Sequence, residues 1–208
     1  LLICSRGLLL LISCSPVPTK GYTKQAKKDQ QFTPVFNDTF QKALYEVEIS
    51  YGSKNISGVA IIKRMEEAQT FRTVFMSETG LKYFDFEYFQ NDSTVVHYMM
   101  DAMDRKKIIR TLTTDLGLIL KKNPDQKILT YYVAENSKTE FIIKEKQQGH
   151  RYYRFDENGK QPTKISRKAF LSPATEVEIS YNPEGIPSKI VFTHGIINFK
   201  MELKLITE

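Results

Sequence analysis

Cysteine, tryptophan and histidine are scarce in this chain. Among 208 residues there are two cysteines, Cys4 and Cys14, three histidines and no tryptophan. No apolar run approaches the roughly 20 residues that a membrane-spanning helix needs, which argues against a transmembrane helix. There is also no phosphate-cradling glycine loop, no nucleophile elbow and no dinucleotide fingerprint. We therefore expect a protein that is not an enzyme and that holds no cofactor.

The three histidines do not form a local metal motif. His97, His150 and His194 fall on different expected strands, without H-x-x-x-H spacing and without a cysteine partner. A metal site would depend wholly on the fold. We expect each histidine to be a partly exposed strand residue and predict no metal site.

Charge is abundant but mixed. The formal net charge is +6, yet basic and acidic residues alternate along most of the sequence. The two short basic clusters, Lys20 to Lys28 and Arg105 to Lys107, are expected to be a solvated linker and an exposed helical turn. This distribution argues against a nucleic-acid partner.

The beginning of the chain has the pattern of a bacterial lipoprotein signal. Arg6 precedes a short apolar run, which ends in the lipobox Leu11, Ile12, Ser13 and Cys14. The small Ser13 leaves the scissile bond accessible, and the thiol of Cys14 can take a diacylglyceryl group. We expect residues 1–13 to be a signal peptide, with further leader residues upstream because the apolar run is short. The alternative is that Leu8 to Ile12 begins a buried strand or helix.

Residues 14–38 are predicted to be a lipidated cysteine followed by a flexible tether. Pro16, Pro18, Gly21 and Pro34 lie among lysines, glutamines and threonines, with few large apolar residues before Phe32. Residues 39–208 are then expected to form one domain. Once the signal is removed, the exported chain keeps only Cys14 and cannot form an internal disulfide.

From residue 44 onward the hydrophobic pattern has a period of two, which is typical of half-buried antiparallel strands. In residues 44–51, Tyr45, Val47 and Ile49 alternate with polar residues. The same alternation places Phe84, Phe86 and Tyr88 on one face of residues 81–89, and Phe199, Met201 and Leu203 on one face of residues 197–205. Further strands are expected over 56–64, 71–76, 94–100, 128–134, 140–146, 150–156, 164–170, 176–181 and 187–194.

One segment changes to a helical period. Between Asp101 and Asn123, apolar residues including Ile108, Leu112 and Leu116 recur at spacings of three and four. Asp101 is expected to cap the start of this helix, and Asn123-Pro124 to end it. The fold class predicted is mainly β: a strongly curved antiparallel sheet, or half-barrel, of about 11 strands with this amphipathic helix on its concave face.

The expected aromatic strand 81–89 also carries two carboxylates at alternate positions. Asp85 and Glu87 point to the same face and could form the acid and base pair of a glycoside hydrolase. More often, such a pair is a solvated strand face, which is the interpretation that we favour. Gly58 in strand 56–64 is expected to mark a bulge or a close approach of another backbone.

The combination of lipobox, tether and strands interrupted by one helix resembles the LolA/LolB-like half-barrel proteins of Gram-negative bacteria. The stretches Ile56–Arg64 and Ser77–Phe86 are similar to small lipoproteins of Bacteroides-type organisms. The resemblance covers roughly residues 40–206 as a pattern. It implies an incomplete barrel whose apolar cavity takes acyl chains.

We therefore predict a non-enzymatic outer-membrane lipoprotein, anchored through Cys14, whose domain faces the periplasm or the cell surface and binds a lipid or acyl chain. The expected ligand-binding residues are Tyr45, Val47, Ile49, Phe84, Phe86, Tyr88, Ile108, Leu112, Leu116, Phe199, Met201 and Leu203. Each of them can equally serve plain core packing. The alternative function is a tethered module that recognises an envelope protein, for example by strand addition at an open sheet edge.

Overall fold

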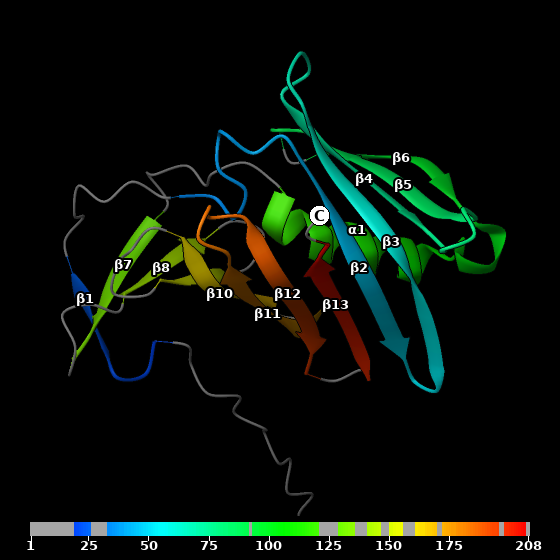
Figure 1. Ribbon diagram of the computed structural model, residues 1–208. Helices are drawn as coiled ribbons and strands as arrows, with labels where there is room; N and C mark the ends of the chain where they lie inside the picture. Colours follow the sequence, from blue (N-terminus) through cyan, green and yellow to red (C-terminus); the bar gives the residue numbers. More distant parts are fainter. Residues whose placement is uncertain are drawn as a thin grey trace, which may run out of the picture.

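A computed structural model describes residues 19–25, 33–91, 93–120, 129–135, 141–146, 150–155, 161–169, 172–195 and 198–206. The predicted signal peptide and the lipobox, Leu11, Ile12, Ser13 and Cys14, lie outside these residues. Thirteen strands form a single sheet in which every recorded strand pair is antiparallel (Figure 1).

The elements follow one another along the chain as β1 (Tyr22–Gln25), β2 (Lys42–Tyr51), β3 (Lys54–Met65), β4 (Thr70–Met76), β5 (Lys82–Tyr88), β6 (Thr94–Met99), the short 3-10 helix η1 (Asp101–Met103), α1 (Lys106–Leu120), β7 (Leu129–Ala134), β8 (Phe141–Lys146), β9 (His150–Phe155), β10 (Pro162–Ala169), β11 (Ser172–Tyr181), β12 (Pro187–His194) and β13 (Phe199–Leu205).

The sheet consists of two meanders joined in the middle. Strands β2 to β6 pair in chain order, as do β7 to β13, and β13 pairs with β2 to join them. The edges of the sheet are therefore β6 at one end and β1, which pairs with β7, at the other. Such chain-neighbour pairing needs only short turns, because antiparallel strands can be connected by hairpins.

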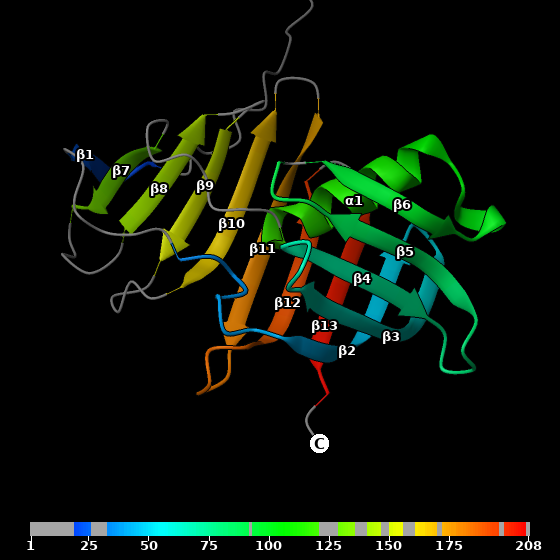
Figure 2. The ribbon, with the colours of Figure 1, turned by 90° about the horizontal axis from the view of Figure 1, so that it is seen from above.

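The sheet curves around α1, as the sequence predicted. In Figure 2, β2 to β6 curl over the helix while β7 to β11 spread away on the other side. Alternation creates the apolar concave face: in β2, Tyr45, Val47 and Ile49 are buried, and Glu46 and Glu48 between them are exposed. The predicted fold class, a mainly β curved antiparallel sheet with one helix, is confirmed, with thirteen strands instead of about 11.

The predicted helix boundaries were wrong at the start. Residues 101–103 form η1, and α1 begins only at Lys106, so Asp101 does not cap it. Met103 is buried in the core, and its amide donates to the Met100 carbonyl over 2.8 Å. Packing of this turn therefore separates Asp101 from the helix. The expected end near Asn123 lies outside the described residues.

The segment predicted to be a flexible tether is, where it is described, part of the domain. Tyr22 to Gln25 form β1, whose residues pair with Ala134 to Tyr131 of β7. Further on, Val35 and Phe36 are 3% exposed, and the Phe36 ring packs on Phe40 with centroids 4.5 Å apart. The polar composition misled the prediction because backbone pairing needs no apolar side chain, and two buried residues suffice to fix a short segment.

Two further expectations concern local geometry and the membrane. A Cβ added at Gly58 would collide with the backbone carbonyl of Met76 on the neighbouring strand, so the close approach predicted there is real. Strands β2 and β3 keep a continuous register through Gly58, so it is not a bulge. Within the described part of the chain, no helix has the length and apolar character needed to cross a membrane.

Candidate functional site

Most of the predicted ligand-binding residues meet in one continuous core. Tyr45, Val47, Ile49, Phe84, Phe86, Tyr88, Leu112, Leu116, Phe199, Met201 and Leu203 are all buried in a single cluster, and Ile108 packs against it. The helix itself fills the concavity, because its residues from Asp115 to Leu120 are all buried. These side chains therefore contact one another, and of this set only Tyr88 also lines the pocket described next.

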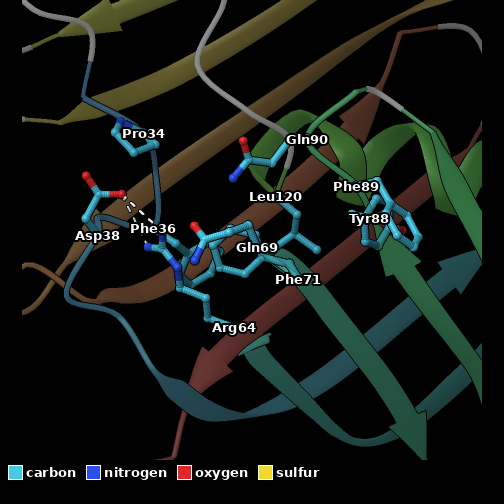
Figure 3. A pocket seen from close by; sticks show the side chains of 10 residues that line it. All are labelled: Pro34, Phe36, Asp38, Arg64, Gln69, Phe71, Tyr88, Phe89, Gln90 and Leu120. Carbon is cyan, nitrogen blue, oxygen red and sulfur yellow. Dashed lines mark hydrogen bonds and ion pairs between the residues drawn. The ribbon is translucent and has the colours of Figure 1, made fainter. Parts of the chain in front are cut away.

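A pocket of about 230 Å³ lies where α1 ends. Figure 3 shows its walls, which come from the segment before β2, the β3–β4 connection, the end of β5 and the last residue of α1. Six of its ten lining residues are apolar or aromatic, and four are polar or charged. The residues are Pro34, Phe36, Asp38, Arg64, Gln69, Phe71, Tyr88, Phe89, Gln90 and Leu120.

A single guanidinium group lies at this pocket. Arg64 donates to Asp38 Oδ1 from Nη2 over 3.2 Å and to the Asn37 carbonyl from Nη1, also over 3.2 Å. Its guanidinium carbon lies 5.8 Å from the centre of the Phe71 ring. The Arg64 side chain is 16% exposed but that of Asp38 is 93% exposed, so this ion pair contributes little stability and Asp38 can move aside.

The pocket also contains an unusual backbone conformation. Gln69 has φ of 51°, in the left-handed region, and is the one non-glycine residue with positive φ in the described part of the chain. Its side chain folds back and donates to the Glu66 carbonyl over 2.7 Å. Gln69 and Gln90 are exposed lining residues, which places them at the mouth of the pocket.

Behind the pocket, Tyr88 lies beside Asp115 of α1. The Tyr88 hydroxyl is buried and has no hydrogen-bond partner within the described residues. Burial raises the pKa of this phenol well above its ordinary value, and the nearby negative charge of Asp115 raises it further. Tyr88 thus connects the apolar pocket with a buried polar region on the other side.

The buried polar region beside Tyr88 is formed around Asp115 and His194, which are 79 positions apart in the sequence. His194 Nε2 lies 2.7 Å from Asp115 Oδ2, and Thr175 donates to Asp115 Oδ1 over 3.5 Å. His194 as a whole residue is partly exposed, as expected, but its side chain is only 6% exposed, so the imidazole is largely enclosed. The helical spacing in the sequence could have indicated that Asp115 is buried, because it lies on the same stripe of the helix as Leu112 and Leu116. Nothing local pairs it with His194.

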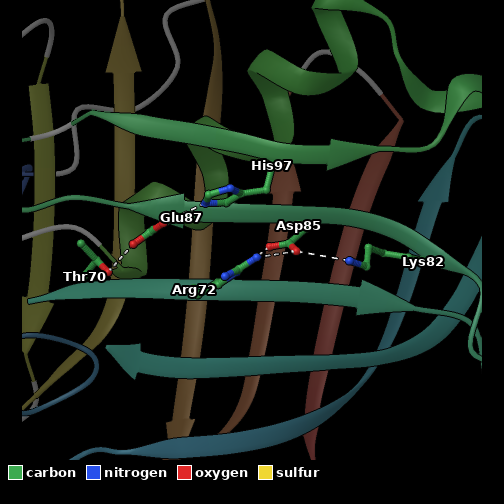
Figure 4. A network of polar contacts seen from close by, with 6 residues as sticks. All are labelled: Thr70, Arg72, Lys82, Asp85, Glu87 and His97. Carbon is green, nitrogen blue, oxygen red and sulfur yellow. Dashed lines mark hydrogen bonds and ion pairs between the residues drawn. The ribbon is translucent and has the colours of Figure 1, made fainter. Parts of the chain in front are cut away.

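On the convex face, Asp85 and Glu87 belong to two separate groups of contacts (Figure 4). Arg72 binds both oxygens of Asp85, at 2.9 and 3.0 Å, and Lys82 adds a contact at 3.4 Å. Burial is the largest influence on the pKa of Asp85 and raises it, but Arg72 and Lys82 together outweigh it and lower the pKa overall. Asp85 is buried, so the expected solvated face applies only in part.

Glu87 accepts from Thr70 Oγ1 over 2.7 Å, and His97 Nε2 lies 2.8 Å from its other oxygen. These two contacts lower the pKa of Glu87. A glycosidase acid needs a raised pKa, so neither carboxyl of this pair is suited to donate a proton. Across the described ranges, no cluster of three or more His, Cys, Asp or Glu side chains could hold a metal ion.

No model of a known protein family matches the sequence, and no curated protein matches it either. Among solved structures, the fold is similar to that of a DUF1329 family protein from Desulfovibrio piger, with a TM-score of 0.50 and 9% sequence identity. The similarity covers 82% of this chain and 85% of that one. At this identity the similarity concerns the fold alone, and the resemblance to the LolA/LolB-like group stays a prediction.

Proposed function

We propose that the protein is a non-enzymatic lipoprotein of the bacterial outer membrane, anchored through Cys14, which binds the apolar chain of a lipid in the pocket at the end of α1. The observation that carries the proposal is the pocket itself, in which six apolar or aromatic residues lie beside one guanidinium group and three other polar side chains. Apolar concavities with few polar groups are where such ligands bind.

The size of the pocket restricts what enters it. Its 230 Å³ is below the range of roughly 300–1,000 Å³ typical of sites that enclose a whole small ligand. It therefore suits a segment of one chain and not a complete lipid. Binding here also differs from the expectation of a hollow beneath the helix, because the concave interior is packed.

Arg64 adds selectivity for the end of the chain. Its guanidinium lies against Phe71 and donates to the Asn37 carbonyl, and among the described residues its charge is balanced by the exposed Asp38. An anionic end group on the ligand can replace Asp38 and form the stronger, charge-assisted hydrogen bonds. We therefore favour a fatty acid or another acyl chain with an acidic end.

The test uses decanoate and decanol with the purified chain carrying Cys14→Ser, measured by calorimetry. The parent should bind decanoate more tightly than decanol, and Gln90→Trp, which fills the mouth, should weaken decanoate binding at least tenfold. Ser53→Trp, at the exposed β2–β3 turn, is the matched control and should leave binding unchanged. Equal binding by parent and Gln90→Trp, or no binding of either probe, refutes the pocket as the site.

The anchor has its own test. Burial of acyl chains contributes about 0.8 kcal/mol per CH₂, and stable attachment needs more than one chain, as a diacylglyceryl cysteine provides. Cys14→Ser should therefore abolish labelling by radioactive palmitate and release the protein from the membrane fraction. Continued membrane retention of the variant counts against the anchor and the proposed location.

A second candidate, a module that recognises an envelope protein, is favoured by β6. This edge strand exposes Val95, Val96 and Tyr98, each 40–42% accessible, and pairs on one side only, with β5. Such an edge can accept an extended peptide by strand addition. Val96→Pro should abolish capture of one stoichiometric envelope protein, and leave decanoate binding unchanged, if this candidate is correct.

A further inference from the structure

A row of polar side chains crosses the concave face from β8 to β12. The strand registers place Glu145 opposite Arg151, Arg151 opposite Arg167, Arg167 opposite Thr175, and Thr175 opposite His194. We call these five residues the polar row. It runs parallel to the apolar row two residues away, in which Ile143, Tyr153, Ile165, Val177 and Phe192 are buried.

Both carboxylates near this row already have partners. Asp115, which reaches in from α1, is bound by His194 at 2.7 Å and by Thr175 at 3.5 Å. Glu145 accepts from the Tyr153 hydroxyl over 2.9 Å and lies 3.6 Å from Arg151 Nη1. Neither carboxylate is recorded in an ion pair with Arg167.

Arg167 is the residue of the polar row whose positive charge has no ion-pair partner among the described residues. Its Nε is buried and has no hydrogen-bond partner in the described part of the molecule. Burial lowers the pKa of its guanidinium; the charge of Asp115 opposes this, and those of Arg151 and Arg110 lower the pKa further. Three guanidinium groups thus share one neighbourhood with two carboxylates that are already engaged.

A second buried atom lacks a partner as well. His194 Nδ1 accepts and donates no hydrogen bond among the described residues, although the side chain is 6% exposed. Unpaired polar groups cost roughly 1–3 kcal/mol each when buried, and charged ones cost more. Each such group in a native structure calls for an explanation, and a ligand that supplies the missing partner is one.

The row is also accessible. Arg151 and Arg167 are only partly buried, and Arg110 of α1 is exposed. Each of these three arginines therefore keeps solvent-exposed surface that an anion can contact.

We propose that the polar row is a binding site for a phosphate group, which Arg167 binds directly. Arg151 and Arg110 lie around the phosphate, and His194 and Thr175 lie deeper in the row. Phosphate matches the site better than a carboxylate because several donors surround it, and phosphate presents more acceptor oxygens and more charge. His194 Nδ1 can accept from a protonated phosphate oxygen or, in a charged imidazole, donate to it. The phosphate can be free or belong to a phospholipid head group.

This inference does not depend on the apolar pocket, which has a different lining. The two sites can be tested in one protein, because Gln90→Trp should not affect phosphate binding and Arg167→Met should not affect decanoate binding. Failure of one proposal is thereby distinguishable from failure of the other.

The first experiment measures the melting temperature and calorimetric binding with inorganic phosphate against chloride at constant ionic strength. At ten times the dissociation constant, phosphate should raise the melting temperature by roughly 3 °C. Arg167→Met should weaken phosphate binding at least tenfold, and should melt at the same or a higher temperature without phosphate, because it removes an unpaired buried charge.

Arg167→Lys keeps the charge but loses the planar fork, and should weaken binding severalfold. Arg154→Met is the matched control: it removes one guanidinium from β9, beside Tyr153 and therefore on the opposite face, and should change the affinity less than twofold. Melting of Arg167→Met well below the parent would assign a purely structural role to Arg167 and overturn the proposal.

The second experiment identifies the source of the phosphate. Vesicles of phosphatidylglycerol mixed into phosphatidylcholine are compared with phosphatidylcholine alone, using the chain with Cys14→Ser. Retention on the phosphatidylglycerol vesicles that is lost in Arg167→Met supports a lipid head group. Binding of inorganic phosphate without any vesicle preference supports a free phosphate ligand. Absence of both refutes the site.

Discussion

The concave face has two parts that differ in which buried groups they leave without a partner. In the apolar part, the rings of β4 and β5 and the aliphatic rows of β11 to β13 pack in one continuous core, and the buried groups without a partner there are two neutral hydroxyls, those of Thr73 and Tyr88. The polar row lies two residues further along the strands and contains Arg167 Nε and His194 Nδ1, which have no partner among the described residues. Apolar burial is non-directional, so packing alone satisfies it, whereas each buried polar atom requires a specific partner. The part in which the unpartnered group is a guanidinium is therefore where an anionic ligand is expected.

The largest effect should come from the apolar part. Phe86 is fully buried and stacks on Phe84 with ring centroids 4.4 Å apart. Phe86→Ala should lower the free energy of unfolding by about 3–5 kcal/mol, because it removes apolar contacts and leaves a cavity. Urea denaturation measures this loss. Leu81→Ala, at a position 54% exposed, is the control and should change stability by less than about 0.5 kcal/mol.

An intermediate effect is expected where α1 meets the polar row. Asp115→Ala leaves the buried His194 Nε2 and Thr175 hydroxyl without an acceptor, and should cost about 2 kcal/mol of unfolding free energy. Combined with His194→Phe, the loss should be smaller than the sum of the two single losses, because the pair acts together. Strict additivity in this double-mutant cycle would show that the contact contributes nothing, and the contrast between the two parts would then weaken.

The smallest effect should come from the convex face, where Glu202 is paired with solvated lysines. Lys200 and then Lys189, by their hydrogen bonds, lower the pKa of Glu202 from 4.5 to about 2, although partial burial opposes them. A carboxyl whose folded pKa is lowered stabilises the fold above its unfolded pKa, and this contribution disappears as the pH falls from about 4.5 to about 2. Its size should be about 1 kcal/mol or less, because the lysines are solvated.

Glu202→Gln isolates this contribution. The variant should be slightly less stable than the parent at pH 7, and the difference should vanish near pH 2, as measured by urea denaturation at both values. An unchanged difference between pH 7 and pH 2 would show that the effect comes from packing of the side chain and not from its charge.

Much of the fold could be predicted because burial on one face imposes a period of two. Tyr45, Val47 and Ile49 are on the concave face as their alternation indicated, and the same holds for Met201 and Leu203 in β13. Strand β1 could not be found in this way, because Tyr22 to Gln25 are held by backbone pairing with β7, for which side-chain polarity is uninformative. The start of α1 was predicted wrongly because Asp101 is a good capping residue and was expected to begin the helix. Instead, packing of Met103 in the core forms the separate turn η1 there.

The candidate sites were less predictable than the fold. Of the residues that line the pocket, the sequence pointed only to Tyr88, because Pro34 and Phe36 belong to a segment that looked like a tether. The polar row could not be found either, since Arg167, Thr175 and His194 alternate with apolar residues like any strand positions and become neighbours only through register.

The amino-acid sequence alone determined which residues of each regular strand and of the helix share an apolar face: periods of two and of 3.6 separate apolar from polar faces, and that segregation follows from local geometry and the hydrophobic effect. Only the tertiary structure decided which polar groups meet. Asp115 and His194 are 79 positions apart in the sequence. Their 2.7 Å contact depends on the curvature of the sheet and on the position of α1 against its concave face. Hydrogen bonds are short-ranged and directional, so the contact could not be predicted from either residue alone.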